Sequence, residues 1–463
     1  MVAITVFLVL TGCGNPGESG PPQAGGSAEQ PDSAMPESVV IEPHAAEEIP
    51  VEQPAPTVAV GEAAPQPQPV PPPQPVPQPQ PDPGVTPADT PPPATPKPKI
   101  TLTPRGNVPQ GRSLLKPRGP VVKGTEGDLD SKGYHTVEVF YGTDRQPSGL
   151  ETPSGRYGTE RNRTGPMEYG RMEVSIPKHH RMGIVERPKW YRLEFSEDPK
   201  KHVVILRTDR LEKDAFFDSV TGSAEDRELQ EALLFIHGFN VAFDDALRRT
   251  AQIAFDLDFG GVAMAFSWPS RASVTAYTVD QGNAQWAVPH LAEFLLDLQE
   301  NTDLDKIHVI AHSMGTRVLT YALAEAVDLG FDLELNNVIL AAPDIDADIF
   351  KDQILPKIRN TTDKLTMYAS SRDAALKVSQ TIHASMRLGQ SGGSMLVLDG
   401  MDTVDASEID TSMIGHGYYG SHELVVRDIF NLVIKGLDPP ERKLVPGPLG
   451  EWDFLDFVKD NAP

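Results

Sequence analysis

Residues 307–316 have the sequence IHVIAHSMGT, and this stretch decides the fold of the chain. The apolar run up to Ala311 predicts a buried strand, and a helical pattern begins directly after Ser313. A serine between such a strand and such a helix lies on a sharp, strained turn, a nucleophile elbow, which exposes its hydroxyl group. The turn needs small residues two positions before and after the serine. Gly315 meets this need, and Ala311 stands where a glycine is usual. We therefore expect Ser313 to be a nucleophile.

Short β-rich runs alternate with amphipathic helical stretches on both sides of this turn. The middle strands are apolar throughout, which is typical of strands covered on both faces of a parallel sheet. Alternating strands and helices predict an α/β fold with three layers. The expected strands are 136–141, 171–176, 202–206, 232–236, 262–267, 306–311, 337–341, 364–369 and 403–406, and the expected helices are 243–257, 285–298, 314–327, 347–358, 374–386 and 421–434.

Several short motifs in a fixed order support this interpretation. They are FYGTDR at 140–145, HGFN at 237–240, SWPS at 267–270, AHSMG at 311–315, APDID at 342–346 and GHGYY at 415–419. With them, the segment 137–434 resembles a bacterial α/β-hydrolase family of uncharacterised function. The resemblance implies the α/β-hydrolase fold, a mostly parallel central sheet with helices on both faces, and a serine nucleophile. It says little about the substrate.

A second loop agrees with the serine motif. The strand expected at 232–236 ends in His237-Gly238, about 75 residues before the serine. In α/β-hydrolases this loop supplies one amide of the oxyanion hole, and the residue after the nucleophile supplies the other. We therefore expect the main-chain N–H groups of Phe239 and Met314 to form it. The histidines of these two motifs, His237 and His312, are expected to be structural.

The acid of a catalytic triad should follow the serine and precede the histidine. Asp373 comes just after the strand expected at 364–369, from where a carboxylate can orient the imidazole. Asp344 is the alternative acid, because it follows the preceding strand. Asp344 and Asp346 also come before a helix, a position at which aspartate commonly caps the helix.

The base should come from the loop after the last strand. His416 lies in a glycine-flanked stretch before the final helix, and it is the preferred candidate. His422 is the alternative, although it falls in the first turn of that helix.

Together these residues predict acyl transfer to water through an acyl-enzyme intermediate. A carboxylic ester, either a small molecule or lipid-like, is the expected substrate, while an amide or thioester would use the same machinery. The segment 271–283 is expected near the mouth of the site, and it is too polar for a long apolar lid. The alternative is a non-catalytic protein with the same fold, which serves as a binding or tethering module in the cell envelope.

The first residues indicate export and lipidation. An apolar run, VAITVFLVL at 2–10, leads into LTGC at 10–13, which resembles a lipobox with Cys13 as the lipid acceptor. We expect a membrane-anchored lipoprotein of the bacterial envelope that faces the periplasm or the exterior. We divide the chain into a signal segment (1–13), a proline-rich linker (14–130), an α/β-hydrolase domain (131–440) and a C-terminal tail (441–463).

Composition supports this division and narrows the partners. Proline makes up 19 of the 50 residues from 51 to 100, which predicts a disordered, extended stalk. The formal net charge is −24, so nucleic acid is not an expected partner. Cys13 is the single cysteine, which excludes an intrachain disulfide and a cysteine zinc site. The mechanism implies neither a metal nor an organic cofactor.

Overall fold

The computed structural model describes residues 131–188, 194, 196–393, 395–407 and 422–454. Cys13, the proline-rich stretch and His416 therefore lie outside the described residues.

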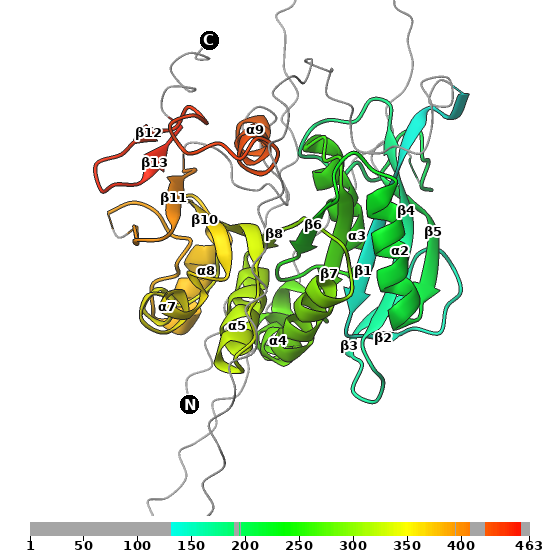
Figure 1. Cartoon of the computed structure of the whole chain (residues 1–463), viewed down its shortest axis with the longest axis horizontal. Helices are drawn as coiled ribbons and strands as arrows, with labels where there is room; N and C mark the ends of the chain where they lie inside the picture. Colours follow the sequence, from blue (N-terminus) through cyan, green and yellow to red (C-terminus); the bar gives the residue numbers. More distant parts are fainter. Residues whose placement is uncertain (1–130, 189–193, 195, 394, 408–421, 455–463) are drawn as a thin grey trace, which may run out of the picture. The chain divides into compact units, whose positions relative to one another are not determined.

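An eleven-stranded sheet forms the centre of the described part (Figure 1). Its order is β5-β4-β1-β7-β6-β8-β9-β10-β11-β13-β12. Neighbouring strands pair in parallel throughout the central run β1-β7-β6-β8-β9-β10-β11-β13. At the two edges, β4, β5 and β12 are added by antiparallel pairing. The strands are β1 (Tyr134–Thr143), β4 (Glu168–Pro177), β5 (Val204–Leu211), β6 (Glu231–Ile236), β7 (Val262–Ser267), β8 (Lys306–His312), β9 (Leu335–Ala341), β10 (Thr362–Ala369), β11 (Asp402–Asp405), β12 (Val445–Pro446) and β13 (Trp452–Asp453), while β2 (Arg145–Pro147) and β3 (Tyr157–Arg161) form a separate hairpin.

Helices connect the parallel strands. They are α2 (Lys213–Glu225), α3 (Phe243–Asp256), α4 (Tyr277–Glu300), α5 (Met314–Asp328), α6 (Ala347–Ile349), α7 (Leu355–Ile358), α8 (Ala374–His383) and α9 (His422–Val433), with the short turns η2 (Val274–Ala276) and η3 (Phe350–Ile354). This arrangement confirms the predicted α/β-hydrolase fold, with a mostly parallel sheet and helices on both of its faces.

The two faces of the sheet carry different helices because side chains alternate along a strand. Leu234 of β6 and Val309 of β8 face the core that contains α2, α4 and α5. Their neighbours Leu233 and Ile310 face the opposite core, where α3 and α9 contribute apolar side chains. Both sets of strand residues are fully buried. The apolar runs in the sequence reflect this burial on two faces.

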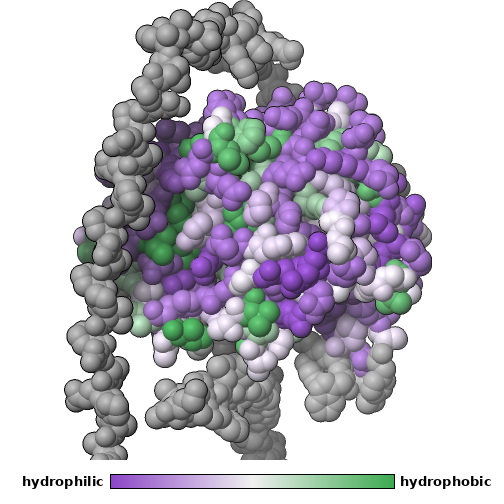
Figure 2. Space-filling model, turned by 90° about the horizontal axis from the view of Figure 1, so that it is seen from below, coloured by the Kyte–Doolittle hydropathy of each residue, from purple (hydrophilic) through white to green (hydrophobic). Residues whose placement is uncertain are grey.

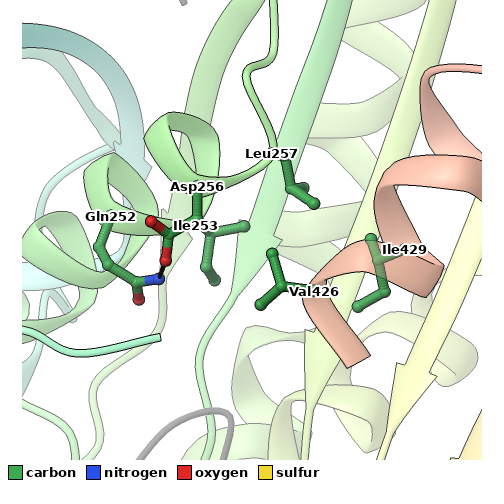
Figure 3. A pocket seen from close by; sticks show the side chains of 6 residues that line it. All are labelled: Gln252, Ile253, Asp256, Leu257, Val426 and Ile429. Atoms are coloured by element: carbon green, nitrogen blue, oxygen red, sulfur yellow. Dashed lines mark hydrogen bonds between the residues drawn. The ribbon is translucent and has the colours of Figure 1, made fainter. Parts of the chain in front are cut away.

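Helices α3 and α9 meet on the second face. Ile253 of α3 and Leu257, directly after that helix, lie beside Val426 and Ile429 of α9 (Figure 3). Helix α9 begins at His422, directly after the undescribed segment 408–421 that contains His416. This packing holds α9 against the second face of the sheet.

The structure departs from the predicted elements most clearly in its helices, and the short strands β2, β3, β12 and β13 were not predicted either. Helix α2 was not expected, and helix α4 begins at Tyr277 instead of residue 285. The helix expected at 347–358 is divided into α6, a π-helical turn and α7. Gly222 lowers the helix propensity of the α2 region, but packing of Phe216, Val220 and Ala224 into the core outweighs this cost.

The surface in the view of Figure 2 is mostly hydrophilic, with small separated hydrophobic patches. Among the helices described, none is both long enough and apolar enough to cross a membrane.

Candidate active site

Ser313 occupies the turn between β8 and α5, at the carboxyl end of the sheet. Its backbone dihedrals are φ 49° and ψ −121°, and it is half-buried. A non-glycine residue with positive φ is strained, so the surrounding contacts must hold it there. Its N–H donates to the carbonyl oxygen of Ala341 at 2.9 Å, and the Thr316 hydroxyl donates to its carbonyl oxygen at 2.5 Å. This conformation is the strained turn that the motif predicts.

Two glycines allow the loop after β6 to approach this turn. A Cβ atom on Gly315 would lie 2.7 Å from the carbonyl oxygen of Ile236 and closer still to that of His237. A Cβ on Gly238 would lie 2.8 Å from Nδ1 of His312 and 3.0 Å from Cβ of Ser313. The loop that contains Phe239 is therefore packed directly against the serine.

The two expected oxyanion donors border the same turn. Met314 is the first residue of α5, so its N–H has no partner within the helix and lies at the positive end of the helix dipole. Phe239 follows Gly238, and its ring packs against Tyr277 at 5.2 Å. The geometry is compatible with an oxyanion hole at the mouth of the turn.

The histidines of the two motifs are poor bases. Burial, together with the neighbouring Arg145, lowers the pKa of His237 to about 3. Burial and the charge of Arg249 lower the pKa of His312 to about 3 as well. Both imidazoles are therefore neutral at physiological pH and resist protonation, which agrees with the structural roles expected for them.

Asp344 is engaged in a buried polar cluster. Its Oδ1 accepts hydrogen bonds from Ser379 at 2.6 Å and from Nε of Arg387 at 2.9 Å, and its Oδ2 accepts one from Tyr277 at 2.5 Å. Both Asp344 and Arg387 are almost fully buried. This carboxylate ties the loop after β9 to α4 and α8, and it is committed to these partners.

The other two aspartates cap helices. Asp346 accepts hydrogen bonds from the N–H groups of Asp348 and Ile349 at the start of α6, as expected for a capping residue. Asp373 accepts one from Leu376 at 3.0 Å at the start of α8. It stands after β10 at the carboxyl end of the sheet, where the sequence analysis puts the acid. A carboxylate accepts several hydrogen bonds, so capping the helix does not prevent Asp373 from accepting one from an imidazole.

The base lies outside this geometry. His416 belongs to the undescribed segment 408–421, and the alternative, His422, is the first residue of α9. Within the described ranges, no group of three or more histidine, cysteine, aspartate or glutamate side chains could hold a metal ion.

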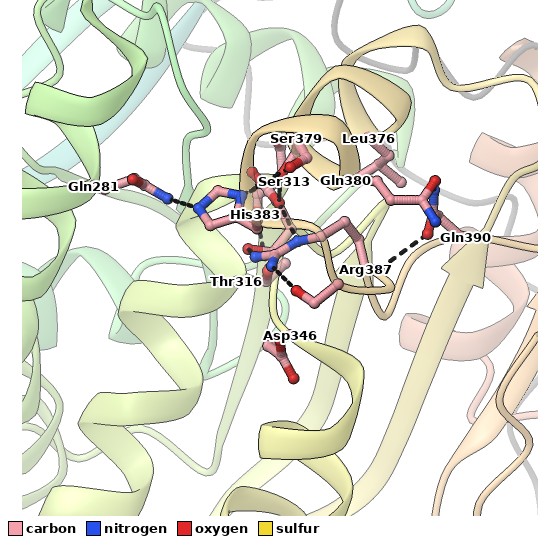
Figure 4. A network of polar contacts seen from close by, with 12 residues as sticks. Gln281, Ser313, Thr316, Asp346, Leu376, Ser379, Gln380, His383, Arg387 and Gln390 are labelled. Atoms are coloured by element: carbon pink, nitrogen blue, oxygen red, sulfur yellow. Dashed lines mark hydrogen bonds and ion pairs between the residues drawn. The ribbon is translucent and has the colours of Figure 1, made fainter. Parts of the chain in front are cut away.

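The contact between α4 and α8 was not predicted from the sequence. Figure 4 shows Ser313, Ser379, His383 and Arg387 grouped close together. Nδ1 of His383 donates to the Ser379 carbonyl oxygen at 2.8 Å, and its Nε2 contacts the side-chain amide of Gln281. Both ring nitrogens of His383 are thus engaged. The spacing of four residues between Ser379 and His383 was the signal for a shared helix face.

Comparisons with known proteins agree with the fold. Residues 213–434 match the model of a family described as "Alpha/beta hydrolase of unknown function (DUF900)". An uncharacterised protein of Nostoc sp. is 27% identical over 137 residues, which cover 24% of this chain and 36% of that protein. The match thus spans little more than a third of that relative's length.

Two solved structures are also similar. A chain described as a predicted CIB-like hydrolase from Thermoplasma acidophilum is 18% identical, with 45% of this chain and 88% of that chain covered and a TM-score of 0.26. One described as a cell surface hydrolase from Lactobacillus plantarum is 10% identical, with 46% and 95% covered and a TM-score of 0.28.

The parallel sheet, the strained serine turn and the family match together define the class of this protein. The chain has the α/β-hydrolase fold, and its resemblance to an α/β-hydrolase family of uncharacterised function is confirmed over residues 213–434.

Proposed function

We propose that the chain is a serine hydrolase that cleaves a carboxylic ester through an acyl-enzyme intermediate. The observation that carries this proposal is the backbone of Ser313, with φ 49° between a buried strand and the first turn of a helix. Strain of this kind persists where the surrounding structure enforces it, and it commonly marks functional residues.

In the proposed mechanism, His416 removes the proton from the Ser313 hydroxyl as the oxygen attacks the ester carbonyl. Asp373 orients the imidazole and stabilises the imidazolium that forms. The amides of Phe239 and Met314 donate hydrogen bonds to the oxyanion. His416 then returns the proton to the leaving alcohol, and water, activated by the same imidazole, hydrolyses the acyl-enzyme. Asp373 is preferred because it stands just after β10 at the carboxyl end of the sheet, where a triad acid can reach the imidazole.

Apolar side chains near the serine turn favour an ester with an apolar portion. The rings of Phe239 and Tyr277 pack together next to the loop at Gly238. The contact between Tyr277 and His383 brings α4 and α8 together. The rings of Phe239 and Tyr277 would contact an acyl chain outside the turn.

The proposal extends to location. The lipobox-like LTGC at 10–13 and the proline-rich stretch after it support a lipid on Cys13, with the catalytic domain held away from a membrane of the bacterial envelope. The substrate would then be a small-molecule or lipid-like ester at the envelope surface.

Ester hydrolysis by the Ser313→Ala variant tests the nucleophile. We expect turnover of nitrophenyl esters to fall by several orders of magnitude, on the order of 10⁴ or more, with unfolding unchanged. Ser219→Ala on α2 is the matched control, because its hydroxyl only contacts the carbonyl oxygen of Ala215 in its own helix.

Equal turnover by the two variants would end the assignment of Ser313. A panel of oxygen esters, thioesters and amides with graded acyl lengths then identifies the bond cleaved. A wild-type protein that hydrolyses none of them, and yet is folded, would favour a non-catalytic binding module.

A further inference from the structure

The imidazole of His237 contacts the peptide unit that carries one of the proposed oxyanion donors. Its Nδ1 lies 2.8 Å from the carbonyl oxygen of Gly238. The peptide bond between Gly238 and Phe239 is planar and trans, so this carbonyl and the Phe239 N–H point in opposite directions. A hydrogen bond that fixes the carbonyl therefore also fixes the direction of the Phe239 N–H.

The bond forms only when the imidazole carries its proton on Nδ1, and Arg145 selects that tautomer. Nη2 of Arg145 lies 3.3 Å from Nε2 of His237, and the Ser267 hydroxyl lies 3.2 Å from the same nitrogen. A guanidinium has donors only, so Nε2 must accept and the single proton belongs on Nδ1. The carbonyl oxygen of Trp268, 3.1 Å from Nε2, favours the opposite tautomer but does not outweigh the charged donor.

Arg145 is held firmly enough to act in this way. Its side chain is fully buried, and it donates to the Ser267 hydroxyl at 3.0 Å and to the carbonyl oxygens of Ser270 and Val241 at 3.0 and 2.9 Å. Burial lowers its pKa to about 10, so the guanidinium remains charged at neutral pH.

The position of the loop has other supports. Nε1 of Trp268 donates to the carbonyl oxygen of His237 at 2.7 Å, and its indole stacks on the imidazole. On the other side, the carboxylate of Asp280 accepts a hydrogen bond from the Asn240 backbone. The loop is thus anchored before and after Phe239 without the imidazole nitrogens. The hydrogen bonds of the imidazole nitrogens therefore affect the orientation of one peptide unit, the one between Gly238 and Phe239.

We propose that His237 is a positioning residue that aims the Phe239 N–H at the oxyanion, and that Arg145 acts through it by fixing the Nδ1–H tautomer. This inference rests on the proposed function, since it assigns a role within the same site.

The tautomer is measured directly on the wild-type chain. Nitrogen-15 NMR of histidine-labelled protein distinguishes the protonated from the unprotonated ring nitrogen. We expect His237 to be neutral and protonated on Nδ1 from pH 5 to 8. An Nε2–H tautomer would overturn the inference, whether or not the protein hydrolyses esters.

Two near-isosteric substitutions test the consequence. In His237→Asn the amide nitrogen can occupy the place of Nδ1 and keep the donor, whereas in His237→Gln it falls near Nε2 and the donor is lost. We expect His237→Gln to lower kcat by about 10²-fold with little change in KM, as for removal of an oxyanion donor. We expect His237→Asn to retain most of the wild-type kcat.

A trifluoromethyl ketone inhibitor separates orientation from general damage. Its adduct with the serine places an oxyanion in the hole, so its inhibition constant should rise in step with the fall in kcat. Equal kcat and equal inhibition for the Asn and Gln variants would contradict the inference. A wild-type protein that neither hydrolyses esters nor forms the adduct would contradict the proposed function instead, and the NMR result would still decide the tautomer.

Discussion

At the residue scale, the serine turn depends on how closely two backbones approach. Ser313 is strained, and the carbonyl oxygens of Ile236 and His237 lie against Gly315, the second residue of α5. Because Gly315 has no side chain, there is room for these two carbonyl oxygens. The sequence motif predicts a small residue at position 315, and the close approach of the two carbonyl oxygens is the physical reason for it.

A matched pair of helical glycines tests this crowding. Gly315→Ala inserts a methyl group against backbone and should destabilise the fold by about 1–3 kcal/mol or more. Gly222→Ala, at an exposed position in α2 with no atom within 4 Å of the new methyl, should stabilise it by about 1 kcal/mol. Urea unfolding of both variants measures the difference. Similar effects of the two substitutions would contradict the close approach.

The two candidate acids should respond differently to loss of charge. Asn is as good a helix cap as Asp, so Asp373→Asn should keep α8 intact while kcat falls by about 10⁴-fold. Asp344→Asn leaves the buried Arg387 without its counter-charge and should cost about 3–5 kcal/mol of stability. Unfolding curves and ester kinetics on both variants separate the roles. A folded Asp344→Asn variant without activity, beside an active Asp373→Asn, would reverse the assignment.

At the element scale, the protonated side chain of His180 links the segment after β4 to helix α3. Nδ1 of His180 lies 2.8 Å from Glu186, and its Nε2 lies 2.9 Å from Asp256 at the end of α3. Burial lowers the pKa of His180, but its hydrogen bonds to the two carboxylates outweigh burial and raise the pKa to about 9. The protonated form is therefore the one that stabilises the fold.

This histidine should make stability depend on pH. Because the folded pKa is above the unfolded value of about 6.5, the contribution is complete below pH 6.5 and is lost as the pH rises through about 9. Over that window the wild type should lose on the order of 3 kcal/mol relative to His180→Gln. Denaturant unfolding at several pH values measures the two slopes. Parallel pH profiles would show that the imidazolium adds nothing.

The sequence predicted the central elements well and the peripheral ones poorly. Strand β7 begins and ends where expected, and α5 begins at Met314, because a strand buried on two faces and a helix behind a sharp turn leave strong local patterns. Helix α2 was missed because Gly222 weakens its local signal. Its apolar face becomes stable only against the sheet.

At the scale of the whole molecule, the site depends on pairs that are distant in the chain. Arg145 meets His237 across 92 residues, and Asp344 meets Arg387 across 43. The sequence predicts Ser313 as the nucleophile and the loop at Gly238 as its neighbour, because each is a contiguous motif at the end of a strand. These two contacts could not be predicted from the sequence, because no local pattern indicates which distant residue a buried charged side chain will contact.

The proposed anchor acts on the whole molecule as well. Replacing the single cysteine, Cys13→Ser, should move the protein from the membrane fraction to the soluble fraction, because the lipid supplies the attachment. Cell fractionation with mass analysis of the N-terminal peptide measures this. Wild type and variant in the same fraction would contradict lipidation at Cys13.

The most direct test of the central claim is covalent labelling with a fluorophosphonate probe. The probe reacts with an activated serine next to an oxyanion hole, and peptide mass analysis finds the modified residue. We predict one probe per wild-type chain, attached to Ser313, and no labelling of Ser313→Ala. A folded wild-type protein that does not react, or that reacts at another serine, would contradict the account.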